Sequence, residues 1–143
     1  MAAIIRVLPA ILWMSLIFVL SAQDQRPGPE PRSVAVPQTP GSAAQPTEDL
    51  FNILGHLALY GVLAACLWWA LWLTRLTSWG RLAITFGIAM LYGATDEWHQ
   101  SHVANRQASQ FDLLVNAAGA LAAVVLIMIV LWTISRISPS PRR

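Results

Sequence analysis

The chain has little charge: only 11% of its 143 residues are charged, whereas 56% are hydrophobic. A soluble globular domain carries about 25% charged residues. The composition therefore excludes an ordinary soluble domain and, together with long apolar runs, predicts an integral membrane protein. Its length fits a single domain.

Lysine is absent, and cysteine occurs once, as Cys66. All nine basic residues are arginine, and the densest cluster is the terminal pair Arg142-Arg143. No basic patch of the kind that binds nucleic acid is present in the sequence, so no nucleic-acid partner is expected. A lone cysteine excludes an intrachain disulfide, and its apolar neighbours favour a small buried residue.

Four apolar segments predict an all-α membrane bundle of four transmembrane helices in one domain, residues 1–143. The helices are expected at about 5–22, 50–74, 82–101 and 110–135, and the proline-rich segment 23–49 is interpreted as an extended external loop. The third segment has only 14 residues from Leu82 up to Asp96. Since a span needs about 20 residues, this helix must continue through Gln100 and carry polar residues into the membrane thickness.

The arginines predict the orientation of the bundle. One side holds six of them, namely Arg6, Arg75, Arg81, Arg136, Arg142 and Arg143, and the other side holds Arg26, Arg32 and Arg106. Arginine is enriched in cytoplasmic loops, so both termini are expected in the cytoplasm. Tryptophans gather towards the same ends, as in an aromatic belt: Trp68, Trp69, Trp72, Trp79 and Trp132. Cleavage of the first segment as a signal peptide after Ala22 is the alternative, but Leu20 is a poor residue for such a site, which favours a retained helix.

A cluster of polar residues ends the third predicted helix. Asp96, His99 and Gln100 are spaced i, i+3, i+4 and share one face, with Tyr92 one turn earlier and Glu97 beside them. Such a cluster is costly within a membrane and usually marks a functional site. Asp96 next to His99 suggests a general base whose imidazole is oriented by the carboxylate. A solvated helix end is the simpler interpretation.

A metal site is the less favoured interpretation of the same residues. Asp-Glu-x-His lacks the two-histidine i, i+4 spacing of a zinc-binding helix, so His56 or His102 would have to complete it. The prediction is therefore that no metal and no cofactor is bound.

Further candidate ligand-binding residues lie on the second and fourth helices. His56 and Tyr60 are spaced i, i+4 and share a face, where packing is the common role of such residues. Ser109 and Asp112 resemble a helix N-cap with an acidic first turn. Asn116 follows one turn deeper, and the small residues around Gly119 predict close helix packing that directs Asp112 and Asn116 into the bundle.

Arg106 is the only cation between the third and fourth helices. It is expected either to pair with one of the nearby carboxylates or to bind an anionic group such as a lipid phosphate. Together, Glu97, Gln100, Arg106, His56, Tyr60, Asp112 and Asn116 form the predicted ligand-binding set.

These residues carry a resemblance to a known family. Tyr-Gly-x-x-Asp-Glu-x-His-Gln at 92–100, then Arg106, then Ser109-x-x-Asp112-x-x-x-Asn116-x-x-Gly119 is similar to the VanZ-like family of bacterial membrane proteins. Gly55-His56-Leu-x-x-Tyr60 resembles that family's helix with a histidine and a tyrosine, so the resemblance covers roughly 52–125. The chain departs from the family where Asn52 to Gly55 lack its Asp-Lys pair.

The resemblance implies a role in the bacterial envelope and a place in the cytoplasmic membrane. The family's namesake is associated with resistance to the glycopeptide teicoplanin. The expected partners are membrane lipids and an amphipathic envelope lipid or lipoglycopeptide. Three classes of function remain open: a lipid-binding or accessory protein, an intramembrane hydrolase with His99 as base, and a small transporter. A transporter is disfavoured because the sequence shows no internal repeat or broken helix.

Overall fold

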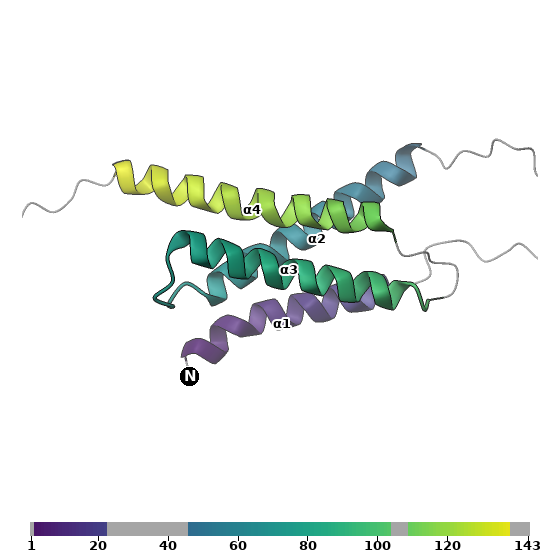
Figure 1. The fold of residues 1–143 in the computed structure, drawn as a ribbon, viewed down its shortest axis with the longest axis horizontal. Helices are drawn as coiled ribbons and strands as arrows, with labels where there is room; N and C mark the ends of the chain where they lie inside the picture. Colours follow the sequence, from purple (N-terminus) through teal and green to yellow (C-terminus); the bar gives the residue numbers. More distant parts are fainter. Residues whose placement is uncertain (1, 23–45, 104–108, 138–143) are drawn as a thin grey trace, which may run out of the picture.

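The protein is described by a computed structural model that covers residues 2–22, 46–103 and 109–137. These residues form four helices: α1 (Ala2–Ser21), α2 (Pro46–Ala70), α3 (Ser78–Gln100) and α4 (Gln110–Ile137). The chain reverses direction at each connection, so the start of α3 and the end of α4 lie at the same end of the bundle as the N-terminus (Figure 1). The all-α prediction is confirmed.

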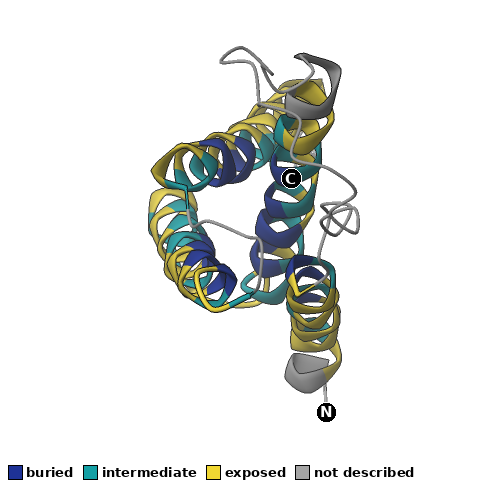
Figure 2. Ribbon diagram, turned by 90° about the vertical axis from the view of Figure 1, so that its right-hand side faces the viewer, coloured by how far each residue is buried: buried dark blue, intermediate teal, exposed yellow. Residues whose placement is uncertain are grey.

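Two of the helices are long and apolar enough to cross a membrane, over Leu50–Ala70 and Gln110–Ile137, and Ile5–Ser21 is a shorter apolar helix. Buried residues occupy the sides of the helices that face one another, whereas the outer sides are exposed (Figure 2). The exposed outer surface carries many large apolar side chains, among them Leu91, Leu114 and Leu126. A soluble monomer rarely exposes so much apolar surface, and contact with lipid accounts for it.

The helix boundaries differ from the predicted ones most at the start of α3 and at both ends of α2. α3 begins at Ser78, not at Leu82, because the hydroxyl of Thr77 caps the helix by accepting a hydrogen bond from the Gly80 N–H at 3.0 Å. As predicted, α3 continues through Gln100.

α2 begins at Pro46, so the last part of the expected external loop is helical. The fixed φ of proline suits a first helical turn. α2 ends at Ala70, not near 74, because the bonds tighten to the i→i−3 type, with the Trp72 N–H donating to Trp69 O at 3.1 Å. The rest of that loop, 23–45, and the tail from 138 lie outside the described residues.

The most extensive helix contact joins α2 to α4. At their crossing, a Cβ atom added to Gly119 would stand 2.9 Å from the Cα of Leu57, and one added to Gly61 would stand 3.4 Å from the Gly119 carbonyl oxygen. Only glycine fits at Gly119, since the neighbouring atoms belong to the backbone. The predicted close packing of the fourth helix is confirmed.

α1 packs against α2 and α3. Its Ala10 and Ile17 are buried in the core, and the Trp13 indole N–H donates to the Leu59 carbonyl at 2.8 Å. The Tyr92 hydroxyl of α3 donates to the Met14 carbonyl. A cleaved first segment would remove these contacts, and retention of α1 stays a prediction.

Candidate functional site

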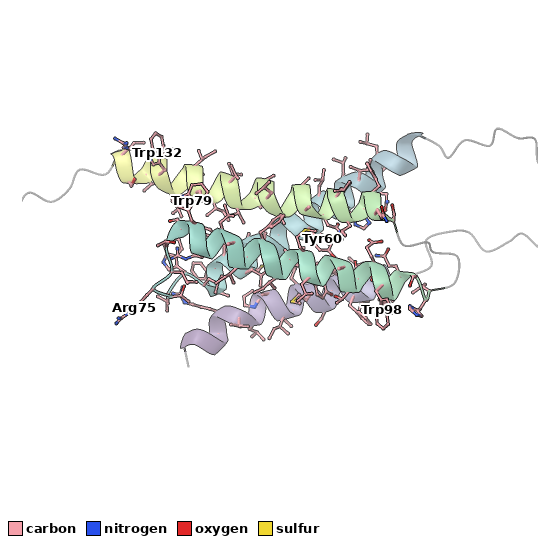
Figure 3. All side chains as sticks on the ribbon, in the orientation of Figure 1. Tyr60, Arg75, Trp79, Trp98 and Trp132 are labelled. Carbon is pink, nitrogen blue, oxygen red and sulfur yellow. The ribbon has the colours of Figure 1, made fainter. Side chains whose placement is uncertain are left out.

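Buried polar side chains gather at one end of the bundle, where α2 and α4 begin and α3 ends. Six of them are at most 7% exposed, and they are called the polar cluster below: His56, Tyr60, Asp96, Glu97, Gln100 and Asn116. Figure 3 shows the end of α3 and the start of α4 on the side of Trp98, opposite the end that carries Arg75, Trp79 and Trp132. All six belong to the set predicted from the sequence.

Asp96 joins α2 to α3 within the polar cluster. Its Oδ2 atom accepts one hydrogen bond from the Tyr60 hydroxyl and one from the Gln100 side-chain amide, both at 3.2 Å. Gln100 follows Asp96 by one helical turn, so the second bond is the expected i, i+4 pair. The other carboxylate oxygen, Oδ1, is buried and has no hydrogen-bond partner.

His56 joins α2 to α4. Its Nδ1 lies 2.9 Å from the side-chain oxygen of Asn116. An amide oxygen can only accept, so Nδ1 carries a proton, and in the neutral ring Nε2 keeps the lone pair. The Asn116 amide nitrogen is buried without a partner.

Gly93 of α3 makes room for both of these pairs. A Cβ atom added to it would stand 3.3 Å from the Tyr60 ring and 3.6 Å from the Asn116 amide nitrogen. The Tyr60–Asp96 pair and the His56–Asn116 pair therefore meet at the surface of this glycine. Gly93 belongs to the Tyr-Gly-x-x-Asp-Glu motif, but nothing in the sequence pattern indicates this role.

Glu97 ties the end of α3 to the start of α4. Its Oε2 accepts a hydrogen bond from the Ser109 backbone N–H at 2.8 Å, and its Oε1 is buried without a partner. The Ser109 hydroxyl in turn accepts from the Asp112 N–H at 3.3 Å, which confirms the predicted N-cap. Glu97 is also close enough to interact electrostatically with Asp112, which is half-buried, and with His56. The sequence carries no signal for the Glu97–Ser109 bond, because its donor is a backbone group.

His99 faces α1. Its ring stacks on Phe18, with centroids 4.4 Å apart and planes 21° apart, and its Nε2 is buried without a partner. Asp96 and His99 are three residues apart, so their side chains point in directions that differ by about 60° around α3. α1 packs on the side of α3 that His99 faces. The structure does not join His99 to Asp96 by a hydrogen bond, since the Asp96 bonds go to Tyr60 and Gln100. A catalytic role for His99 stays a prediction.

Two further residues, Arg106 and His102, belong to the hypotheses drawn from the sequence. Arg106 lies outside the described residues. His102 is exposed and packs edge-on against Trp98, with ring centroids 4.9 Å apart, away from the polar cluster. Within the described part of the chain, no three histidine, cysteine or acidic residues are placed to hold a metal ion.

The fold and the site define a class of protein: an all-helical, multi-pass membrane protein with a buried polar cluster at one end of its bundle. Residues 6–132 match the VanZ/LLP1 family, and the chain therefore belongs to that family. The match is longer than the resemblance seen in the sequence, because it takes in α1. No curated protein and no solved structure is significantly similar to this chain.

Proposed function

We propose that all four helices cross the bacterial cytoplasmic membrane, with both termini in the cytoplasm and the polar cluster at the outer face. The 23 residues of α3 give a helix about 35 Å long at about 1.5 Å per residue, enough for a hydrocarbon core of about 30 Å. The orientation rests on the six arginines at one end against three at the other.

We further propose that the polar cluster binds the head group of an amphipathic envelope lipid or lipoglycopeptide. The observation that carries this proposal is a set of unused hydrogen-bonding atoms on buried side chains: Asp96 Oδ1, Glu97 Oε1 and Asn116 Nδ2. Burying such atoms unpaired costs free energy, and buried polar groups in native proteins usually have partners. A bound head group would supply those partners.

The chemistry of the three atoms narrows the ligand class. Two carboxylate oxygens accept hydrogen bonds and the amide nitrogen donates one. A head group rich in hydroxyl, amide or ammonium groups, as in a sugar or a peptide, offers the complementary donors and an acceptor. Arg106, four residues beyond His102 in sequence, is proposed to contact the phosphate or another anionic group of the ligand. By holding such a lipid the protein would alter susceptibility to glycopeptide antibiotics, in keeping with the association of the family's namesake with teicoplanin.

The hydrolase alternative receives less support from the geometry. A general base needs a partner that orients its ring, and the contacts of His99 are with Phe18. Asp96, which was expected to orient that ring, accepts its hydrogen bonds from Tyr60 and Gln100. Binding through the carboxylates therefore remains the favoured function.

Teicoplanin susceptibility of cells that produce the chain at matched levels tests the proposal. Asp96→Asn removes a carboxylate while keeping the shape, and we expect it to abolish the change in susceptibility that the unaltered chain confers. His99→Gln should leave that change intact, because the proposed site is formed by other side chains. Thr95→Ala is the matched control, since Thr95 is exposed beside Asp96 and bonds only to the Tyr92 carbonyl.

A direct binding measurement separates the two functions. Teicoplanin added to the purified protein in detergent should bind the unaltered chain and the Thr95→Ala variant but bind Asp96→Asn weakly. Loss of the phenotype in both Asp96→Asn and His99→Gln, with binding retained, would favour the hydrolase. Full activity of Asp96→Asn at normal abundance would overturn the proposal.

A further inference from the structure

In the described residues, the acidic residues and the arginines lie at opposite ends of the bundle. The acidic residues of the described segments belong to the first turn of α2 or flank the connection from α3 to α4: Glu48, Asp49, Asp96, Glu97 and Asp112. The opposite end contains the arginines of α1, of the connection between α2 and α3, of α3 and of α4. Within the described ranges, no acidic residue belongs to that arginine-rich end.

Two of these arginines are held on tryptophan rings at the end of α2. The guanidinium of Arg6 lies 4.7 Å from the Trp69 ring centroid, and that of Arg81 lies 5.4 Å and 5.5 Å from those of Trp68 and Trp72. Such cation–π contacts position a guanidinium and leave its charge in place.

The hydrogen bonding of both arginines is incomplete. Arg81 donates from Nη2 to the Leu76 carbonyl at 3.3 Å, which fixes the side chain against the turn before α3. Its Nε and the Nη1 of Arg6 are buried without partners. Among the described residues neither arginine has a carboxylate within ion-pair distance, which leaves both guanidinium charges available to an anionic group of another molecule.

We propose that a surface called the Arg–Trp surface, formed by Arg6, Arg81, Trp69 and Trp72 with Trp68 buried beneath Arg81, binds the phosphate of an anionic phospholipid. Guanidinium groups match phosphate oxygens with paired hydrogen bonds. Trp69 and Trp72 are 52% and 40% exposed, and indole rings are enriched at the level of lipid head groups. The exposed apolar sides of the same helices would receive the acyl chains.

The Arg–Trp surface is separate from the polar cluster and does not depend on the ligand proposed there. The two ends suit different ligands. Carboxylate oxygens, which accept hydrogen bonds, dominate at the polar cluster, whereas guanidinium groups, which donate them, dominate at the Arg–Trp surface. A phosphate carried by a lipid is favoured over a soluble one because two of the rings beside the guanidinium groups, Trp69 and Trp72, are apolar and exposed. The lipid class is therefore one with a net negative head group.

Native mass spectrometry of the purified full chain tests this assignment. The protein in detergent is titrated with phosphatidylglycerol or with phosphatidylcholine of the same acyl chains. We expect tighter binding of phosphatidylglycerol to the unaltered chain, and about fivefold weaker binding to Arg6→Gln and to Arg81→Gln, since each basic residue near a lipid surface contributes about that factor. Arg75→Gln is the matched control because Arg75 belongs to the same end, is exposed and points away from the bundle (Figure 3).

Three results would overturn the proposal. Equal binding of the two lipids by the unaltered chain would remove the role of charge. An equal loss in Arg75→Gln would mean a diffuse surface charge without a built site. Displacement of the lipid by soluble glycerol phosphate would assign the site to a soluble phosphate instead. Should Arg81→Gln lose its helical circular dichroism, the lipid preference of the unaltered chain and the Arg6→Gln titration still decide the matter.

Discussion

His56 and Asn116 lie 60 positions apart in the chain and share a buried hydrogen bond of 2.9 Å between α2 and α4. The bond lies next to Gly119, where the backbones of the same two helices cross. The close backbone packing at Gly119 brings the two side chains within hydrogen-bond distance. With the Asn116 amide in this orientation, its oxygen accepts the hydrogen bond from His56 Nδ1–H.

We expect Asn116→Leu to destabilise the protein, because it leaves His56 buried without its acceptor. The loss in unfolding free energy should be about 1 kcal/mol, within the range found for interhelical hydrogen bonds in membranes. Reversible unfolding in mixed micelles measures it, with His56→Leu and the double variant completing a cycle. Asn52→Leu is the control, since Asn52 is exposed on α2. Additive losses in the cycle would contradict the pairing.

The N-cap of α4 gives a second prediction. Ser109→Ala removes the acceptor of the Asp112 N–H and should cost about 0.5–2 kcal/mol, the usual range for a lost cap. Asp112→Asn keeps the bond and should lose only the interaction with the helix dipole, about 0.3–1 kcal/mol. The same unfolding assay compares them. Ser101→Ala is the control because the Ser101 side chain is exposed and lies outside α4. A larger loss in Asp112→Asn than in Ser109→Ala would contradict this account.

Much of the polar cluster could be predicted from sequence because helical spacing alone sets which residues share a face. His56 with Tyr60, and Asp96 with Gln100, are each four apart, and each pair lies on the buried side of its helix. The cap at Ser109 follows from local chemistry in the same way. Apolar length correctly required α3 to continue through Gln100.

The sequence could not show which neighbour each polar residue meets. His99 was grouped with Asp96 by spacing, yet the place of α1 decides that its ring packs on Phe18, and no local pattern reports that place. Trp68 was assigned to an aromatic belt, but it is 3% exposed because Arg81 and the core cover it. The neighbours of His99 and the burial of Trp68 both depend on how helices that are distant in the sequence pack against each other.

The orientation of the bundle is tested by labelling intact cells with a membrane-impermeant thiol reagent. In a Cys66→Ser background, a cysteine at Ser42 should react from outside, whereas a cysteine at Arg142 should react only after the membrane is permeabilised. The expectation follows from the six arginines at one end, since arginine is retained on the cytoplasmic side. Labelling of the Arg142 position alone in intact cells would reverse the assigned orientation, although the contacts described above would stand.

The sharpest test of the packing compares two glycine-to-alanine changes. A methyl group at Gly119 would stand 2.9 Å from the Cα of Leu57, so Gly119→Ala must push α4 away from α2, at a cost of about 1–3 kcal/mol. The same displacement should break the His56–Asn116 bond, which nuclear magnetic resonance of ¹⁵N-labelled histidine would report as a change in tautomer. Gly87→Ala is the matched control, because nothing lies within 4 Å of its added methyl group and alanine favours a helix. Equal stability of the two variants would mean that α2 and α4 do not cross at Gly119, and the polar cluster would then lose the contact that assembles it.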